Sequence, residues 1–237
     1  MALNNRNRLL ASLKPEDLSI LRRHFREVVI EQGQFLHERG ERVDGVYFPQ
    51  SGMISLIVEM PEDRTIEIGT VGSEGAIGLT TGLGSRVASV SSLVQVSGGA
   101  LCIPASRFRT AAAQSQHLRD MIIRYTELQM GQIEQTAACN ALHEVPARLC
   151  RWLLQTSDKI NDDTIPFTRE FLGNMLGVQR GTIAVAAAKF EAAGLIQARR
   201  GRIELLNKKA LKKEACSCYE YINRHIDRLV PKVAADK

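Results

Sequence analysis

The stretch from residue 168 to residue 194 constrains the fold more than any other part of the chain. Thr168 can cap a helix, because its hydroxyl accepts a hydrogen bond from a backbone N–H at a helix start. Gly177 permits the left-handed backbone of a tight turn, and Gly194 can end a second helix in the same way. The small and apolar positions between them fit two crossing helices, the second beginning near Gln179: Leu172, Gly173, Leu176, Gly177, Val178, Ile183 and Ala186. The spacing predicts a helix-turn-helix.

The residues after Gly194 predict a wing. Residues 195–196 and 203–206 are strand-like, and a basic turn, 199–202, joins them. Charge follows the same division of the chain. Residues 1–143 hold 14 Lys and Arg against 15 Asp and Glu, whereas residues 144–237 hold 17 against 11. This asymmetry is the electrostatic footprint expected of a protein that binds the phosphates of double-stranded DNA.

Side chains on the second helix and on the wing are the candidates for contact with DNA. Arg180 is suited to bind guanine O6 and N7, while Gln179 suits adenine or a phosphate. Thr182, Lys189 and the wing arginines suit phosphates. The complete predicted set is Thr168, Gln179, Arg180, Gly181, Thr182, Val185, Lys189, Arg199, Arg200 and Arg202.

The first half of the chain predicts an antiparallel β domain. Short β-rich runs separated by glycine-bearing turns are typical of a sandwich or barrel, and a jelly roll fits them. The predicted strands are 46–49, 54–60, 65–71, 87–91, 93–96 and 101–103. The fold class is therefore α+β, with a β domain first and a winged helix-turn-helix last.

Between these regions, residues 107–142 predict one long helix. Leu118, Met121, Tyr125 and Leu128 follow 3–4–3 spacing, and a second stripe runs through Ile122, Gln129 and Ile133. Either the first stripe packs on the helix's own domain, or it forms a seam with a second copy of the chain. We favour the seam, since two stripes exceed what one contact needs. We expect a sensor domain over 1–143 with the helix at its end, and a DNA-binding domain over 144–237.

Several classes of protein are excluded by composition and spacing. The longest uncharged stretch, 87–106, contains Ser, Gly, Gln and Pro, so no membrane segment is expected. The five scattered cysteines and the absence of a secretory signal at the N-terminus predict a cytoplasmic protein. The five histidines are dispersed, and no nucleophile or phosphate-loop motif is present, so no enzyme is expected.

No metal site is expected either. Cys216 and Cys218 lack further ligands nearby in the sequence, and helical residues two apart face different ways. A redox pair remains the alternative interpretation of these two cysteines.

The order of these regions resembles the CRP/FNR family of bacterial transcription regulators over about residues 16–206. The matching stretches are 36–41, 46–48 and 51–52 in the β domain, 144–149, and 167–183 with 194–196. The resemblance implies a homodimer that binds a two-fold-symmetric operator and contacts RNA polymerase. It also implies control by a signal at the β domain.

The chain departs from the family pattern where a cyclic nucleotide binds. Ile77 replaces the glutamate five residues after Gly72, and Val87 with Ala88 follow Arg86 where a hydroxyl is expected. No cysteine precedes Cys102, which argues against the family's N-terminal iron–sulfur cluster. We therefore expect neither cofactor, but an unknown small-molecule effector near Gly72, Glu74, Ile77, Gly78, Arg86, Val87 and Ala88.

The sequence thus predicts a homodimeric, sequence-specific DNA-binding transcription regulator, with its signal acting at the β domain. The alternative is a ligand-sensing or scaffold module without specific DNA binding. The operator, the effector and the direction of regulation are not encoded in any motif that we identify.

Overall fold

The computed structural model describes residues 6–61 and 64–230, and only the backbone of residues 64, 169 and 170. Contacts divide the chain into two compact units. The N-terminal unit contains the chain up to Leu56, then Thr70–Gly131, then the chain from Arg224. The C-terminal unit contains Ile57–Gly69 and Gln132–Asn223. Packing therefore divides the chain at different places from the predicted 143/144 boundary, and that functional boundary stays a prediction.

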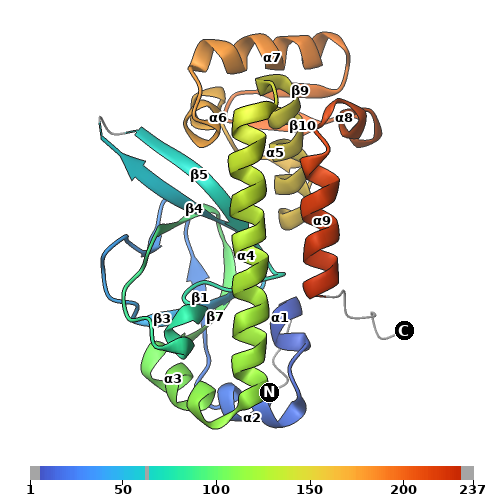
Figure 1. Ribbon diagram of the computed structural model, residues 1–237. Coiled ribbons are helices and arrows are strands. Elements are labelled where there is room, and N and C mark those ends of the chain that lie inside the picture. The colour runs from blue at the N-terminus through green and yellow to red at the C-terminus, as the bar shows by residue number, and fades with distance from the viewer. Residues whose placement is uncertain (1–5, 62–63, 231–237) are drawn as a thin grey trace. The chain divides into compact units, whose positions relative to one another are not determined.

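The N-terminal unit is built on two β-sheets (Figure 1). One sheet has the order β1-β7-β3 and the other β2-β6-β4-β5. The seven strands are β1 (Arg26–Ile30), β2 (Phe35–His37), β3 (Gly45–Pro49), β4 (Met53–Met60), β5 (Arg64–Val71), β6 (Ser91–Val96) and β7 (Gly98–Pro104). The part of β4 from Ile57 and the part of β5 up to Gly69 belong to the C-terminal unit. Aromatic rings fill the space beside β3, where Phe48 contacts Phe25 and Phe108 at centroid distances of 5.6 and 6.2 Å. The predicted β-rich N-terminal domain is confirmed.

One predicted strand is wrong. Of the predicted strand 87–91, residues 87–90 form only an isolated bridge between Val87 and Arg42, and Ser91 begins β6 instead. The backbone here bonds to a loop instead of to a strand: Val43 N–H donates to Arg86 O, and Ala88 N–H donates to Glu41 O.

Helices precede, interrupt and follow these strands in the sequence, and the last of them passes into the C-terminal unit at Gln132. They are α1 (Arg8–Ala11), α2 (Pro15–Arg22), the 3-10 helix η1 (Leu79–Leu83), α3 (Ala105–Gln114) and α4 (Gln116–Leu142). The single long helix predicted over 107–142 is wrong, because Ser115 interrupts it with an extended backbone. Its hydroxyl accepts a hydrogen bond from Leu118 N–H at 3.1 Å, which starts α4 afresh.

The four predicted seam residues point into the interior of the chain. Leu118, Met121, Tyr125 and Leu128 are only 1–3% exposed. Tyr125 fits so closely against the loop 72–78 that a Cβ atom at Gly75 would overlap its hydroxyl. The seam prediction is wrong for these residues, since a buried stripe cannot also face a second copy.

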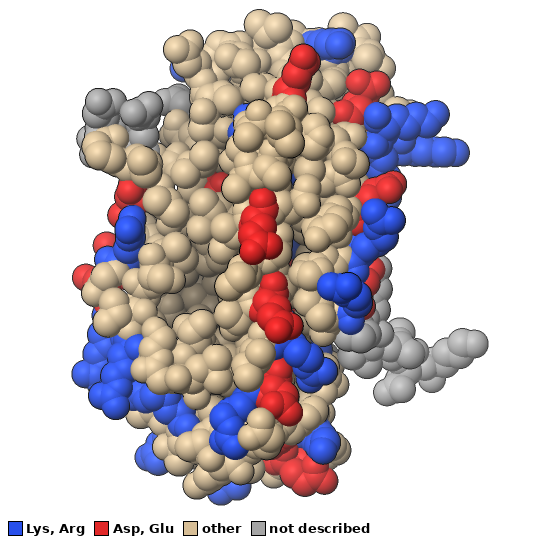
Figure 2. Space-filling model, in the orientation of Figure 1, with Lys and Arg blue, Asp and Glu red and all other residues tan. Residues whose placement is uncertain are grey.

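Instead, α4 leaves other apolar side chains at its surface: Ile123 is 45% and Met130 56% exposed. Asp120, Glu127 and Glu134 are exposed on the same helix. Figure 2 shows acidic side chains following the line of α4.

The C-terminal unit is a helical domain with a small sheet of order β8-β10-β9. Its elements are α5 (Val145–Ile160), β8 (Thr164–Ile165), α6 (Arg169–Leu176), α7 (Arg180–Ala192), β9 (Ile196–Arg199), β10 (Arg202–Leu205) and α8 (Lys208–Glu214). They are followed by α9 (Cys218–Leu229), whose residues from Arg224 belong to the N-terminal unit. Trp152, Phe167 and Phe171 stack at its centre, with Phe167 and Phe171 centroids 4.3 Å apart. No helix in the described part of the chain has the length and apolar character to cross a membrane.

Candidate nucleic-acid interface

The helix-turn-helix forms at the predicted residues. Thr168 Oγ1 accepts a hydrogen bond from Phe171 N–H at 3.2 Å and so caps α6. Gly177 ends α6 with φ +65°, and the chain then turns directly into α7. Gly173 lies where the helices cross, and a Cβ atom there would be 3.0 Å from Val178 O. The glycines thus allow the close approach that the turn requires.

Buried side chains fix the position of α7 on its unit. Leu172, Leu176 and Ile183 are 0–3% exposed. Arg148 of α5 donates a hydrogen bond of 2.5 Å to Leu176 O, one of the last carbonyls of α6. A cation at this position also interacts favourably with the helix dipole. Burial lowers the pKa of the Arg148 guanidinium from its ordinary value.

The outer face of α7 remains accessible. Six residues predicted to contact DNA are exposed at the beginning of this helix or along its outer face: Gln179, Arg180, Gly181, Thr182, Val185 and Lys189. Val185 is 74% exposed, which is unusual for a branched apolar side chain. This helix therefore presents both polar and apolar groups to a partner.

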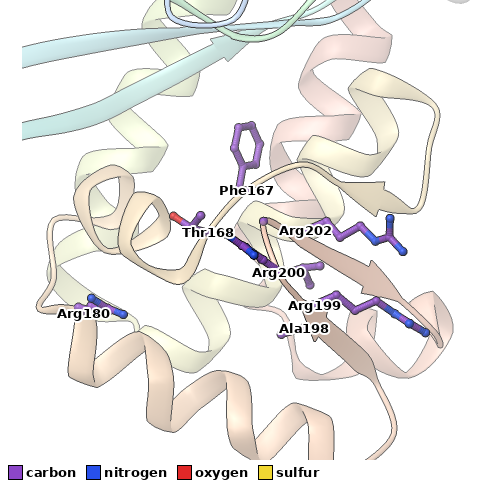
Figure 3. A pocket seen from close by; sticks show the side chains of 9 residues that line it. Phe167, Thr168, Arg180, Ala198, Arg199, Arg200 and Arg202 are labelled. Atoms are coloured by element: carbon purple, nitrogen blue, oxygen red, sulfur yellow. The ribbon is translucent and has the colours of Figure 1, made fainter.

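A hollow of about 410 Å³ lies between the start of α7 and the wing, and Figure 3 shows the side chains around it. Five predicted DNA-contact residues line it: Thr168, Arg180, Arg199, Arg200 and Arg202. In Figure 3 the side chain of Arg200 extends toward Thr168, whereas Arg199 and Arg202 extend the other way. The last two each lie 3.2 Å from a Glu204 carboxylate oxygen. The wing thus directs Arg200 alone toward Thr168.

The predicted effector residues differ in their exposure to solvent. Glu74 is buried and accepts a hydrogen bond from Gly72 N–H at 3.0 Å, within its own loop. Ile77 and Ala88 are also buried, while Arg86 and Val87 are exposed and Gly78 is partly exposed. An effector site at these residues stays a prediction.

Two family models match the chain. The model of the cyclic nucleotide-binding domain matches residues 27–115, and that of the Crp-like helix-turn-helix domain matches residues 147–214. Together they cover more than half of the sequence and agree with the two folds described above. The chain belongs to the CRP/FNR family of transcription regulators.

Solved structures of CRP/FNR proteins share this fold. One is a protein from Eubacterium rectale assigned to the family, with a TM-score of 0.70 and 17% identity over 87% of this chain and 96% of that one. FixK2 from Bradyrhizobium japonicum has a TM-score of 0.70 and 14% identity, over 81% of this chain and 98% of that one. The c-di-GMP responsive regulator CLP from Xanthomonas campestris has a TM-score of 0.66 and 18% identity, over 82% of this chain and 100% of that one. No curated protein matches the chain.

This CRP/FNR chain is a transcription regulator with a helix-turn-helix DNA-binding domain, and the family is not one of enzymes. A scaffold without DNA binding finds no support. The cyclic nucleotide-binding domain is present as a fold, which by itself establishes no cofactor.

One group of residues was missed by sequence reasoning. Cys139, His143, Cys216 and Cys218 place their donor atoms within 4.8 Å of one another. The interpretation of Cys216 and Cys218 as a helical pair without partners is wrong, because the pair lies at the connection of α8 to α9. No local sequence motif predicts this group, because the pair Cys139 and His143 is more than 70 residues from the pair Cys216 and Cys218 in the sequence.

Proposed function

We propose that this regulator reads a specific, two-fold-symmetric DNA site as a homodimer. The observation that carries the proposal is the hollow between α7 and the wing, lined by Thr168, Arg180 and three wing arginines. With its outer face exposed, α7 can enter the major groove, while the basic turn of the wing can contact the adjacent phosphate backbone.

The exposed residues of α7 divide into two roles. In this proposal Arg180, at the first turn, donates to guanine O6 and N7, and Gln179 binds adenine or a phosphate. Val185 is suited to contact the C5-methyl group of thymine, because an exposed apolar side chain gains most from an apolar base edge. Thr182, Lys189 and Arg200 bind phosphates in this arrangement.

The dimer is proposed to form through the exposed face of α4. Ile123 and Met130 are seven residues apart and so lie on one side of the helix. Pairing of two such faces buries the apolar side chains that the single chain leaves in solvent. Two recognition helices then enter successive major grooves about 34 Å apart.

The remaining functional proposals follow from membership of the family. An effector other than a cyclic nucleotide acts at the β domain and shifts the balance between two arrangements of the dimer. It can do so only if it binds those arrangements with different affinity. The protein acts on DNA in the cytoplasm and contacts RNA polymerase.

Selection of bound duplexes from a random DNA pool, at near-physiological salt and without added ligand, tests the proposal. Enrichment of a palindrome supports a dimeric reader. Binding that is weak, unselective and lost with salt shows phosphate contact without sequence readout and contradicts the specific claim for the unliganded protein. No binding at any salt concentration would contradict DNA recognition altogether.

A further inference from the structure

Four potential metal ligands converge at one place in the C-terminal unit. Cys139 lies near the end of α4 and His143 directly follows that helix, while Cys216 lies between α8 and α9 and Cys218 begins α9 (Figure 1). The Cys139 and Cys216 sulfur atoms are 3.5 Å apart, and Cys218 Sγ is 3.5 Å from His143 Nδ1. All three thiols are buried, and the imidazole is partly exposed.

We propose that Cys139, His143, Cys216 and Cys218 bind one Zn²⁺ ion. Tetrahedral zinc, with bonds of about 2.3 Å to sulfur and about 2.0 Å to nitrogen, places two sulfur ligands about 3.8 Å apart and a sulfur and a nitrogen about 3.5 Å apart. The observed distances are close to these values. Three cysteines and one histidine are also a common ligand set of structural zinc sites.

The local backbone explains why the ligands meet. Cys139 and His143 are four residues apart, and His143 N–H donates to Cys139 O at 3.0 Å, so one helical turn aligns both side chains. Ala215 ends α8 with an extended backbone, so Cys216 and Cys218 are not held on opposite sides of a helix. Both pairs can therefore face a common centre.

A neighbouring amide supports the site from outside the ligand set. Gln135, one helical turn before Cys139, donates a hydrogen bond from Nε2 to Cys218 Sγ at 3.0 Å. Second-shell donors of this kind orient ligands and stabilise thiolate charge.

The charge of the surroundings also fits. Zn²⁺ with three thiolates and a neutral imidazole has a net charge of −1, and the thiol protons pass to solvent on binding. Arg151 interacts electrostatically with Cys139, and Arg148 with both Cys139 and Cys216. Both guanidinium groups belong to buried residues, and in the described structure their Nε atoms lack hydrogen-bond partners. Buried cations favour an anionic centre nearby.

A disulfide explains less of this arrangement. A bond between Cys139 and Cys216 would leave Cys218 and His143 without a role, and it requires a sulfur–sulfur distance of about 2.05 Å. Zinc uses all four groups. It would join the end of α4 to the segment after the wing, with residues 144–215 between the two ligand pairs, and so close the winged helix at both ends.

Metal content of the full chain, purified in reducing buffer, tests the proposal. We expect one zinc per chain by mass spectrometry. On exchange, Co²⁺ should give the visible bands of a tetrahedral ion and an ultraviolet thiolate-to-cobalt charge-transfer band. Cys218→Ser and His143→Ala should lose stoichiometric zinc, and Gln135→Ala should lower zinc affinity about 10–100-fold.

Cys150→Ser is the matched control, because Cys150 is buried in the same unit but outside the cluster, and it should retain one zinc. His143→Ala changes a partly exposed side chain and so keeps the test independent of folding. The proposal is overturned if wild-type protein has no more zinc than Cys218→Ser, or if Co²⁺ gives no thiolate band. A Cys139–Cys216 disulfide in metal-free protein from a parallel purification without reductant would overturn it in favour of a redox pair.

Discussion

The indole N–H of Trp152 donates a 2.8 Å hydrogen bond to the Glu67 carboxylate, joining α5 to β5 within the C-terminal unit. Both side chains are buried, at 2% and 8% exposure. Trp152 also contacts Phe167 and Phe171, which flank the cap of α6 at Thr168. The hydrogen bond thus anchors the aromatic cluster under the helix-turn-helix.

Removing the donor of this hydrogen bond should destabilise the protein. Trp152→Phe keeps a ring but leaves the buried Glu67 carboxylate with one donor fewer, so the free energy of unfolding should fall by about 1–3 kcal/mol. Urea denaturation measures the change. Glu67→Gln retains an acceptor oxygen and should cost less. Equal stability of Trp152→Phe and the wild type would show that the hydrogen bond is not needed.

Arg180 and Arg200 should differ in their effect on DNA binding. Arg180→Ala should weaken binding to the selected site by about 1–3 kcal/mol and relax the preference at one base pair per half-site. Arg200→Ala should weaken binding to all duplexes alike and lower the salt dependence by about one ion per chain. Fluorescence anisotropy with matched and mismatched duplexes measures both.

Arg107→Ala, an exposed arginine of α3, is the control for lost charge. It should leave the affinity nearly unchanged. Uniform weakening by Arg180→Ala on every sequence would instead make Arg180 a phosphate contact.

Charges placed on the exposed face of α4 should separate the dimer. Ile123→Glu with Met130→Glu adds two carboxylates, each four residues before Glu127 or Glu134, so carboxylates would repel one another where the two helices pair. Sedimentation equilibrium should show the mass falling from two chains to one. Val29→Glu changes a 73% exposed side chain on β1 and should not alter the mass. An unchanged mass in the double variant would place the dimer contact elsewhere.

His37 should make stability depend on pH. Burial is the main cause that lowers the pKa of His37 below 6.5, outweighing the hydrogen bond with Gly45 O and the charge of Asp44. The unfolded chain therefore takes up a proton at a higher pH than the folded one. Stability is complete above about pH 6.5 and is lost as the pH falls from there through the lower pKa of the folded state.

His37→Gln should reduce this loss, as measured by urea denaturation across that range of pH. If the free energy of unfolding changed with pH in the same way in the variant and the wild type, a contribution of His37 would be ruled out.

The helix-turn-helix was predictable because its determinants are local. Thr168, Gly173 and Gly177 act on neighbours within a few residues, so spacing alone indicates the turn. The buried side of α4 was not predictable in this way. The spacing of Leu118, Met121, Tyr125 and Leu128 fits a seam as well as an interior face, and the packing of Tyr125 against Gly75 shows that it is interior.

The cysteine–histidine group shows a second limit of sequence reasoning. Cys139 and Cys216 are 77 residues apart, and nothing near either cysteine encodes the other. The break at Ser115 has another cause. Its cap could have been expected from the serine, but residues 107–142 contain no proline and a single glycine, which favoured one helix.

The C-terminal unit is not a continuous piece of the chain. A fragment that begins at residue 144 would contain α6, α7 and the wing, but it would lack Glu67, 85 residues before Trp152, as well as Cys139 and His143. A fragment from residue 144 therefore lacks part of the unit to which the DNA-binding domain belongs. A fusion of this domain to another sensor domain would have to include the residues of β4 and β5 that belong to the C-terminal unit, and the end of α4.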